Sequence, residues 1–384
     1  MLLTSMNLPK GLATFGRDSL LPHFKRAFGS GNANKTGAGI GNVQSQMLPS
    51  TYTDSTRKDE DGQPLTPVWN LLKAPRTATI IPAPMTFGQP FTGVDLGPSS
   101  MIEEGLPSQL SQLGWRIENT PEVDFATEGR EAPGARNSEI VGGGAFKIAE
   151  LVRTNAGEGK FPLTLGGDHS ISIGTLAGML SNYPDLGVIW VDAHADLNTP
   201  EISGSGNMHG MPVGLCTEGM MKDEDLRNIP GLSWLAEKPY KNRLKPSNLV
   251  YVGLRDVDLP ERATIKRLGI KYYSMYDIDR LGIGRVMEGA FQHLTESNPS
   301  RPIHLSYDID AIDPASAPAT GTAVRGGLTY REAHYVAERT ANSGNLVGAD
   351  IVELNPSLSD DKGVAETTQM GLAVVRSFMG ESII

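Results

Sequence analysis

Short apolar runs rich in β-branched residues recur along the chain from Arg76 onward, and polar or amphipathic stretches separate them. Runs of this length and composition predict strands that are buried on both faces of a sheet. The predicted strands are Ala78–Ile81, Phe161–Leu165, Gly187–Val191, Asn248–Leu254, Lys271–Tyr273, Ile303–Tyr307 and Leu346–Val352.

Helical patterns lie between several of these runs, at Phe146–Val152, Val286–Leu294 and Glu332–Thr340. Thr329 precedes the last one at the spacing of a capping box with Glu332. Alternating strands and helices predict an α/β fold with a mostly parallel sheet flanked by helices on both faces. In such sheets, ligands bind at the carboxyl ends of the strands.

The N-terminal segment differs from the rest. Residues 1–28 carry four lysines and arginines but a single acidic residue, Asp18, which is typical of a mitochondrial transit peptide. The alternative is an unstructured extension of a cytoplasmic protein. Residues 29–62 are rich in Gly, Asn, Ser and Thr and predict a flexible linker. We therefore expect an N-terminal extension over residues 1–75 and a single folded domain over residues 76–384.

The charge, the cysteine count and the hydropathy of the chain limit the kinds of partner and compartment to be expected. The 384 residues carry a net charge of -10, which argues against nucleic acid and anionic membranes as main partners. The single cysteine, Cys216, excludes an internal disulfide and fits a reducing or matrix compartment. No apolar stretch approaches the length of a membrane-spanning helix.

Histidines and carboxylates follow four of the predicted strands. His169 follows Leu165, then Asp192, His194 and Asp196 follow Val191, Asp308 and Asp310 follow Tyr307, and Glu353 follows Val352. Side chains at alternate positions of an extended segment share one face, so each set is expected to converge. Asp313 is out of phase with Asp308 and Asp310, and we expect it to serve the turn before Pro314.

Bound divalent metal is the best explanation of this pattern. Four aspartates in one pocket would repel one another without cations, and their charge would offset about that of two divalent ions. Carboxylates mixed with imidazoles suit manganese, magnesium or iron. Each segment alone could be a turn or a helix cap, but together they favour a dinuclear site. His23, His293, His304 and His334 receive no role, and His304 is expected in the core.

The motifs together resemble those of the ureohydrolase family and, within it, the arginases. The segments that carry the resemblance are Gly88-Gln-Pro, Gly166-Gly-Asp-His-Ser, Asp192-Ala-His-Ala-Asp-Leu-Asn198, Ser205-Gly-Asn-Met-His209-Gly, Gly253-Leu-Arg-Asp-Val-Asp258, Ser306-Tyr-Asp-Ile-Asp-Ala-Ile-Asp-Pro and Gly321-Thr322. The resemblance runs from about Thr77 to Ser377 and implies a three-layer α/β/α catalytic domain.

The resemblance also implies a cofactor and a reaction. Two Mn²⁺ ions are expected per subunit, one bound by His169 and Asp196, the other by His194 and Asp310, with Asp192 and Asp308 bridging both. A hydroxide that bridges the metals would attack the guanidinium carbon of L-arginine, giving L-ornithine and urea.

Residue roles in that reaction follow from the same resemblance. Asp196 would take a proton from the nucleophile, and His209 would relay a proton to the leaving amine. Glu353 would bind the guanidinium, assisted by Thr322.

The amino-acid end of the substrate has its own expected contacts. Asn198, Ser203 and Ser205 would bind the α-carboxylate, and Asp258, with Glu261 nearby, would bind the α-ammonium group. Agmatine lacks the carboxylate, so these residues favour arginine. The alternatives are an agmatinase or another guanidine ureohydrolase, a metal deacetylase, or a catalytically silent homologue. Arg331 and Glu332 resemble the family's subunit contact, which implies a homotrimer or a hexamer.

Overall fold

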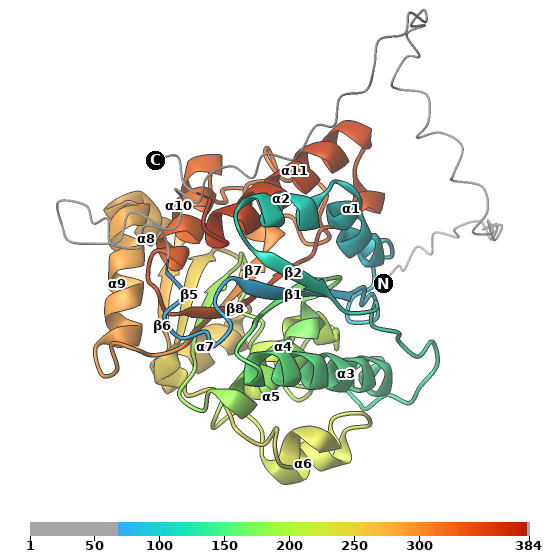
Figure 1. The fold of residues 1–384 in the computed structure, drawn as a ribbon. Coiled ribbons are helices and arrows are strands. Elements are labelled where there is room, and N and C mark those ends of the chain that lie inside the picture. The colour runs from blue at the N-terminus through green and yellow to red at the C-terminus, as the bar shows by residue number, and fades with distance from the viewer. Residues whose placement is uncertain (1–67, 382–384) are drawn as a thin grey trace, which may run out of the picture. The chain divides into compact units, whose positions relative to one another are not determined.

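The computed structural model describes residues 68–381, and within them lies an eight-stranded sheet whose strands are all parallel (Figure 1). The strands are β1 (Thr77–Ala83), β2 (Arg116–Asn119), β3 (Phe161–Gly166), β4 (Gly187–Val191), β5 (Leu249–Leu254), β6 (Lys271–Ser274), β7 (Ile303–Asp308) and β8 (Leu346–Val352). The transit-peptide and linker predictions, and His23, lie outside the described residues.

Helices cover both faces of this sheet, which confirms the predicted fold class. They are α1 (Gly97–Glu103), α2 (Leu106–Gln112), α3 (Ser138–Gly157), α4 (Ser172–Asn182), α5 (Pro212–Cys216), α6 (Asp223–Asn228), α7 (Leu259–Leu268), α8 (Met275–Leu281), α9 (Ile283–Thr295), α10 (Tyr330–Ala341) and α11 (Asp361–Phe378). Figure 1 shows α1, α2, α10 and α11 on one side of the sheet and α3, α4 and α5 on the other. No helix in the described range is long and apolar enough to cross a membrane.

The seven strands predicted from apolar runs all form: two have the predicted bounds, and the ends of the others shift by at most two residues. The eighth strand, β2, was missed. Its sequence, Arg-Ile-Glu-Asn, is polar, and its two end residues are exposed because it pairs only with β1 at the edge of the sheet. An edge strand lacks the continuous apolar run that identifies a strand buried on both faces. The capping box of Thr329 and Glu332 at the start of α10 is confirmed.

The order and register of the strands determine where the residues that follow them emerge from the sheet. The order is β2-β1-β3-β8-β7-β4-β5-β6, which places β7 and β4 side by side at the centre although their sequences are far apart. Val191 of β4 pairs with Tyr307 of β7, and Tyr307 pairs with Ile351 of β8. Since the strands are parallel and end at the same level, the residues that follow them emerge at one edge of the sheet.

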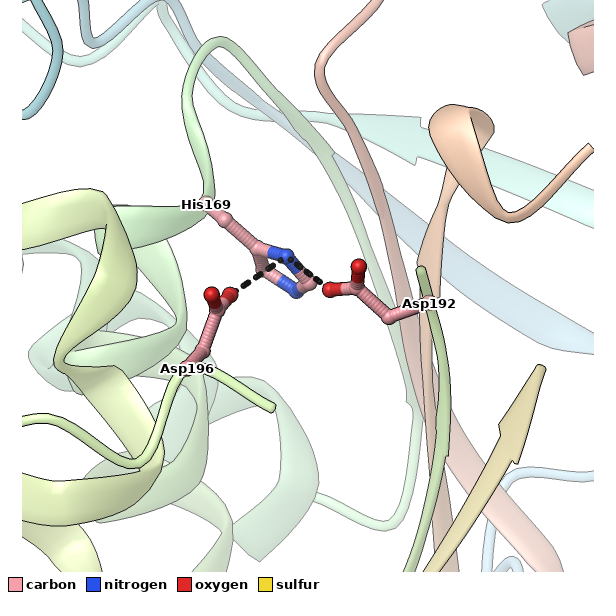
Figure 2. Close-up of side chains that lie close together, drawn as sticks. All are labelled: His169, Asp192 and Asp196. Atoms are coloured by element: carbon pink, nitrogen blue, oxygen red, sulfur yellow. Dashed lines mark ion pairs between the residues drawn. The ribbon is translucent and has the colours of Figure 1, made fainter. Parts of the chain in front are cut away.

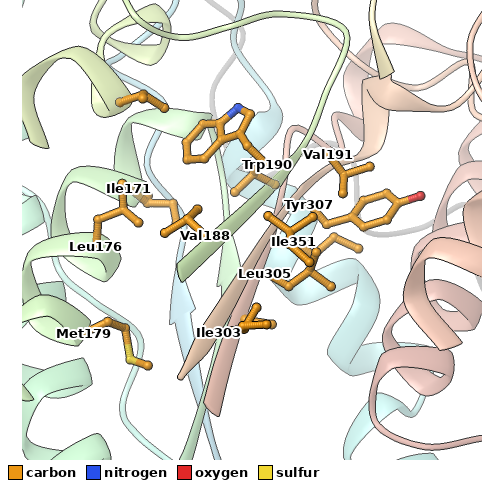
Figure 3. Packing of buried hydrophobic residues seen from close by; sticks show 14 of the residues in the cluster. Ile171, Leu176, Met179, Val188, Trp190, Val191, Ile303, Leu305, Tyr307 and Ile351 are labelled. Atoms are coloured by element: carbon orange, nitrogen blue, oxygen red, sulfur yellow. The ribbon is translucent and has the colours of Figure 1, made fainter. Parts of the chain in front are cut away.

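The core lies between the sheet and its helices. Every residue of β4 and β7 is buried. Alternate residues face opposite sides: Figure 3 shows Val188 and Trp190 toward Leu176 and Met179 of the α4 layer, with Val191 on the other side. This two-sided burial holds the central strands rigidly, so the loops at their carboxyl ends start from fixed positions.

One loop beside the centre depends on a glycine. Gly167 follows β3, and a Cβ atom there would lie 1.9 Å from the backbone oxygen of Met85. Only glycine allows the chain to pass this close to Met85, and His169 follows two residues later.

Candidate metal centre and active site

The first group of candidate metal ligands surrounds the ring of His169. Its Nδ1 atom lies 3.1 Å from carboxylate oxygens of both Asp192 and Asp196 (Figure 2). The same atom lies 3.0 Å from Oδ2 of Asp308. All four side chains are buried. One imidazole nitrogen therefore faces three carboxylates, two from the loop after β4 and one from the end of β7.

A second group shares Asp192 with the first. It consists of Asp192, His194 and Asp310, whose potential ligand atoms all lie within 4.8 Å of one another. The Nδ1 atom of His194 lies 3.1 Å from Asp310 and 3.3 Å from Asp192. The six residues that the sequence singled out as metal ligands thus come together as two overlapping groups.

The predicted reason for this convergence was wrong, although the convergence itself is found. We expected Asp192, His194 and Asp196 to alternate along an extended segment, but β4 ends at Val191 and the loop beyond it turns, with Asp196 in a left-handed conformation at φ 48°. Asp310 likewise lies in a 3-10 helix after β7 rather than in the strand. These side chains converge because of the geometry of the loops and not because of strand alternation.

Neighbouring residues fix the ligands in place. Asp192 Oδ1 accepts the backbone N–H of His194, and its Oδ2 accepts the indole N–H of Trp190 at 3.0 Å. The Trp190 ring also stacks on His169, with centroids 4.2 Å apart and planes 7° apart. A buried strand residue therefore orients ligands from two separate loops.

The charges of the centre are strongly coupled. Burial raises the pKa of Asp308 well above its usual range, and the negative charges of Asp310 and Asp192 raise it further. Burial also raises the pKa of Asp196, to about 6, with a contribution from Asp192. Burial opposes the charged form of His169, but hydrogen bonds to its aspartate neighbours raise its pKa well above the usual value. Without added positive charge, the aspartates compete for protons.

Divalent cations fit this donor set. Four aspartates of the centre, namely Asp192, Asp196, Asp308 and Asp310, form ion pairs. Among the described residues, their only ion-pair partners are His169 and His194. Carboxylate oxygens and imidazole nitrogens are ligands that hard and borderline divalent metals accept, and a cation in each group would relieve the carboxylate repulsion. The one cysteine, Cys216, is not part of either group, and its thiol lies near the backbone oxygen of Ile173.

A pocket of about 150 Å³ opens above the two groups. Its lining residues are His169, His194, Asp196, Asn198, Ser203, Ser205, Asn207, His209, Gly210, Asp256, Asp258, Glu261, Asp308 and Thr322. Asp192 and Asp310 are buried and do not line it, nor does Glu353. A larger cavity, of about 440 Å³ and lined by residues such as Leu254 and Tyr276, contains none of the candidate ligands.

Glu353 lies beside His169 and His209, under the pocket. Its Oε1 accepts the backbone N–H of His169 at 2.9 Å and lies 3.2 Å from Nδ1 of His209, while Oε2 accepts a hydrogen bond from Gln89 at 2.6 Å. Burial opposes protonation of His209, but the Glu353 hydrogen bond and charge raise its pKa to about 9. Glu353 has φ 67°, a conformation that costs about 1–3 kcal/mol in a non-glycine residue and is common at active sites.

Comparison with known proteins agrees with this geometry. The Arginase family model matches residues 76–380. The chain is 46% identical to an arginase of Neurospora crassa, with 82% of this chain and 88% of that protein covered, and 42% identical to "Arginase-2, mitochondrial" of Homo sapiens, with 81% and 87% covered. The native structure of arginase from Bacillus caldovelox superposes with a TM-score of 0.73 at 39% identity, covering 80% of this chain and 99% of that one.

The chain belongs to the Arginase family. In this family member, the residues predicted to bind the amino-acid end of a substrate do line the pocket, but several already have partners. The amide of Asn198 donates to Asp258 at 3.1 Å. Ser203 and Ser205 accept backbone N–H groups of Gly206 and Asn207. Thr322, which was predicted to assist at the guanidinium instead, donates its hydroxyl to Asp310 at 2.8 Å.

Glu261 has a structural function in the described fold. One of its oxygens accepts the backbone N–H of Leu197 at 2.8 Å, and the other accepts that of Asp258 at 3.0 Å. The second contact completes a capping box at the start of α7. Glu261 is buried and therefore ties the loop of Asn198 to the helix that follows Asp258. This contact differs from the ammonium contact predicted for Glu261.

Three site residues were not assigned from the sequence. Asn207 and Asp256 line the pocket, and Gln89 holds Glu353 from below. All three fall inside motifs that supported the family resemblance, and that position was the available signal. Nothing in local spacing distinguishes an amide that faces a pocket from one that caps a loop, so their roles depend on the fold.

Other predictions for single residues are confirmed. Asp313 accepts backbone N–H groups of Ala315, Gly326 and Gly327, as expected for a turn residue. His304 is buried in β7 and its ring lies in the core. Asp168 caps the 3-10 turn that contains His169, so the cap considered for this segment is present alongside the ligand.

We predict that Glu261→Ala destabilises the protein more than the equivalent change in α8. Two buried amides lose their acceptor, and each orphaned group costs on the order of 1–3 kcal/mol. Asp277 has the same capping-box role at the start of α8, where it is only half-buried, so Asp277→Ala should cost only about 0.5–2 kcal/mol. Urea unfolding of both variants at pH 8 with chelator measures the difference. Equal losses would show that the Glu261 link is unimportant.

Proposed function

We propose that the chain is an arginase that hydrolyses L-arginine to L-ornithine and urea. The observation that carries the proposal is the meeting of His169, His194 and four aspartates below a small polar pocket. A pocket this small and acidic suits a cationic, extended group such as a guanidinium better than a bulky apolar ligand. Membership of the Arginase family supports the same activity.

Two Mn²⁺ ions are the proposed cofactor. His169 and Asp196 would hold one, His194 and Asp310 the other, with Asp192 and Asp308 shared between them. The short distances between these side chains support this division. When bound, two divalent ions lower the pKa of a water molecule, so that hydroxide is available as a nucleophile near neutral pH.

Residues that line the pocket or lie directly beneath it are proposed to move protons and position the substrate. Asp196 is a carboxylate that can accept a proton from the nucleophile. His209 contacts Glu353 through Nδ1, which leaves Nε2 as the atom that donates a proton to the leaving amine. A carboxylate has about four acceptor positions, so Glu353 can bind the guanidinium while Gln89 holds it. Thr322 lines the pocket and donates its hydroxyl to Asp310, and its oxygen would accept a hydrogen bond from the guanidinium.

Preference for arginine over agmatine is proposed to arise at the rim. Asn198, Ser203 and Ser205 offer donors to an α-carboxylate, which agmatine lacks. Asp258 offers an acceptor to the α-ammonium group and is already oriented by Asn198. Binding a substrate that leaves such groups unpaired costs affinity, so these residues favour arginine.

The decisive experiment is urea release from arginine and from agmatine, with Mn²⁺ or with chelator. We expect manganese-dependent turnover of arginine, negligible turnover of agmatine, and about two ions per chain by metal analysis. Asp308→Ala should lose nearly all activity and bound metal, whereas Asp313→Ala, which changes a turn aspartate of the same loop, should retain both. Agmatine as the better substrate would identify an agmatinase. Absence of turnover with either substrate would identify a silent homologue.

A second prediction concerns the rim. Asp258→Ala should raise KM for arginine roughly tenfold or more, since it removes a charge-assisted contact to the ammonium group. Metal content should stay unchanged. Steady-state kinetics with arginine, and with a guanidine that lacks the α-amino group, separate the two effects. A similar rise in KM for both substrates would contradict the proposed ammonium contact.

Assembly and location are further parts of the proposal. A homotrimer, or a hexamer of two trimers, is proposed with Arg331 and Glu332 near the subunit contact, since the first is exposed and the second only half-buried at the start of α10. A mitochondrial location is proposed from residues 1–28, and one relative carries that location in its name. Light scattering should give three or six times the mass of the 384-residue chain, and the mass of a monomer would refute the proposed assembly.

Deleting residues 1–28 should abolish mitochondrial import but leave activity intact, and unchanged import would refute the proposed location.

A further inference from the structure

The pocket above the metal ligands is rich in negative groups. Among the described residues, those that line it include five carboxylates but no lysine or arginine. The proposed partners of the α-carboxylate, Asn198, Ser203 and Ser205, carry no charge. Asn198 already donates to Asp258, and the two serine hydroxyls already accept backbone N–H groups. The rim therefore offers the α-carboxylate hydrogen bonds but no permanent positive charge.

A second cavity adjoins this pocket at the serine loop, which comprises residues 203–206. Its volume is about 470 Å³, and Ser203 and Ser205 line both the cavity and the pocket. Among the described residues that line the cavity, Arg136 is the only cation and Glu131 the only carboxylate. Glu131 already has a partner, because its Oε2 accepts a backbone N–H at 3.2 Å. The cavity thus places an arginine beside the serines that are proposed to bind the carboxylate.

Backbone contacts hold Arg136 against the serine loop. Its N–H donates to the carbonyl oxygen of Gly206 at 2.8 Å. A Cβ atom on Gly206 would lie 3.5 Å from Cγ of Arg136, so the aliphatic part of the arginine side chain passes beside this loop. Two residues earlier, Gly134 packs so closely on the backbone of Pro200 that a side chain would not fit there. The segment that carries Arg136 is therefore held alongside the serine loop.

The guanidinium of Arg136 is available to a ligand. The side chain is exposed and, within residues 68–381, it forms no hydrogen bond or ion pair. Arg130, in the same segment, differs, because its guanidinium donates to both oxygens of Glu139, at 2.7 and 3.1 Å. A planar guanidinium matches a carboxylate in charge and in geometry. Arg136 thus lacks a carboxylate partner, and the proposed carboxylate site beside it lacks a cation.

We propose that Arg136 is a specificity-determining residue, whose guanidinium attracts and pairs with the α-carboxylate of the substrate beside the serine loop. The inference rests on the proposed function and adds one residue to its binding site. Asn198 and the serine hydroxyls would orient the carboxylate, and Arg136 would supply the positive charge. Agmatine lacks the carboxylate and is cationic at that end, so the same charge would repel it. Arg136 would therefore favour arginine in two ways.

The alternative is that Arg136 only supports the serine loop. That role does not need a guanidinium, because the contact with Gly206 uses the backbone N–H, which every residue except proline offers. The contact of Cγ needs only an aliphatic stem, which methionine also has. Arg136→Met therefore keeps the support and removes the charge, whereas Arg136→Lys keeps both.

Steady-state kinetics of the full-length, Mn²⁺-loaded protein test the proposal. Arg136→Met should raise KM for L-arginine roughly two- to fivefold, the effect of losing a solvent-accessible ion pair. The kcat should stay unchanged, because the carboxylate is remote from the reacting guanidinium. Arg136→Lys should restore KM, and high salt should reduce the difference between Arg136→Met and the unaltered protein. Arg130→Met is the matched control, since it removes the same charge from the same segment and should leave KM unchanged.

Competitive inhibition separates attraction of the carboxylate from a general change in the pocket. L-Ornithine has the carboxylate and putrescine lacks it, while both carry the same terminal amine. Arg136→Met should weaken inhibition by L-ornithine by the same factor as it raises KM, and inhibition by putrescine should stay the same or strengthen. An unchanged KM, an equal loss for both inhibitors, or an equal rise in KM for Arg130→Met would overturn the role of Arg136. If the unaltered protein fails to hydrolyse L-arginine, the proposed function is overturned instead.

Discussion

Repulsion among buried carboxylates is the constraint on which this structure depends. Asp192, Asp196, Asp308 and Asp310 converge at one edge of the sheet, and each is at most 7% exposed. Removing such charges from water is expensive, and bringing them together adds like-charge repulsion. Two histidines supply part of the compensation. Bound divalent cations would supply the rest. Metal binding would therefore also stabilise the loops that carry these carboxylates.

The sheet makes this arrangement possible by fixing where each loop begins. Central strands β3, β8, β7 and β4 are buried throughout and end at one level. Rigid strand ends allow short loops to hold strained conformations such as those of Asp196 and Glu353. The core also contributes directly, because Trp190 contacts both His169 and Asp192. Strand residues below the pocket are therefore part of the site's architecture.

The residues at the rim of the pocket differ from the buried charged residues at its floor. Asn198, Ser203, Ser205 and Asp258 are polar groups on loops, where their contacts can be exchanged with a ligand. Glu261 is the exception, because it links two of these loops through backbone amides. A buried link of this kind preserves the spacing of the groups that distinguish arginine from agmatine in the proposed function. The Glu261 side chain thus contributes both to local stability and to the proposed substrate specificity.

The amino-acid sequence by itself determined the strands with continuous apolar runs, the α/β class and the set of histidines and aspartates that meet at the centre. Burial on both faces and ligand chemistry leave strong local signals. The tertiary structure alone decided what depends on contacts between distant segments. It showed β2 as a polar edge strand, loop turns rather than strand alternation as the cause of convergence, and Glu261 as a backbone link. It also placed Arg136 beside the serines of the pocket rim, since hydrogen bonds between distant segments leave no trace in local sequence.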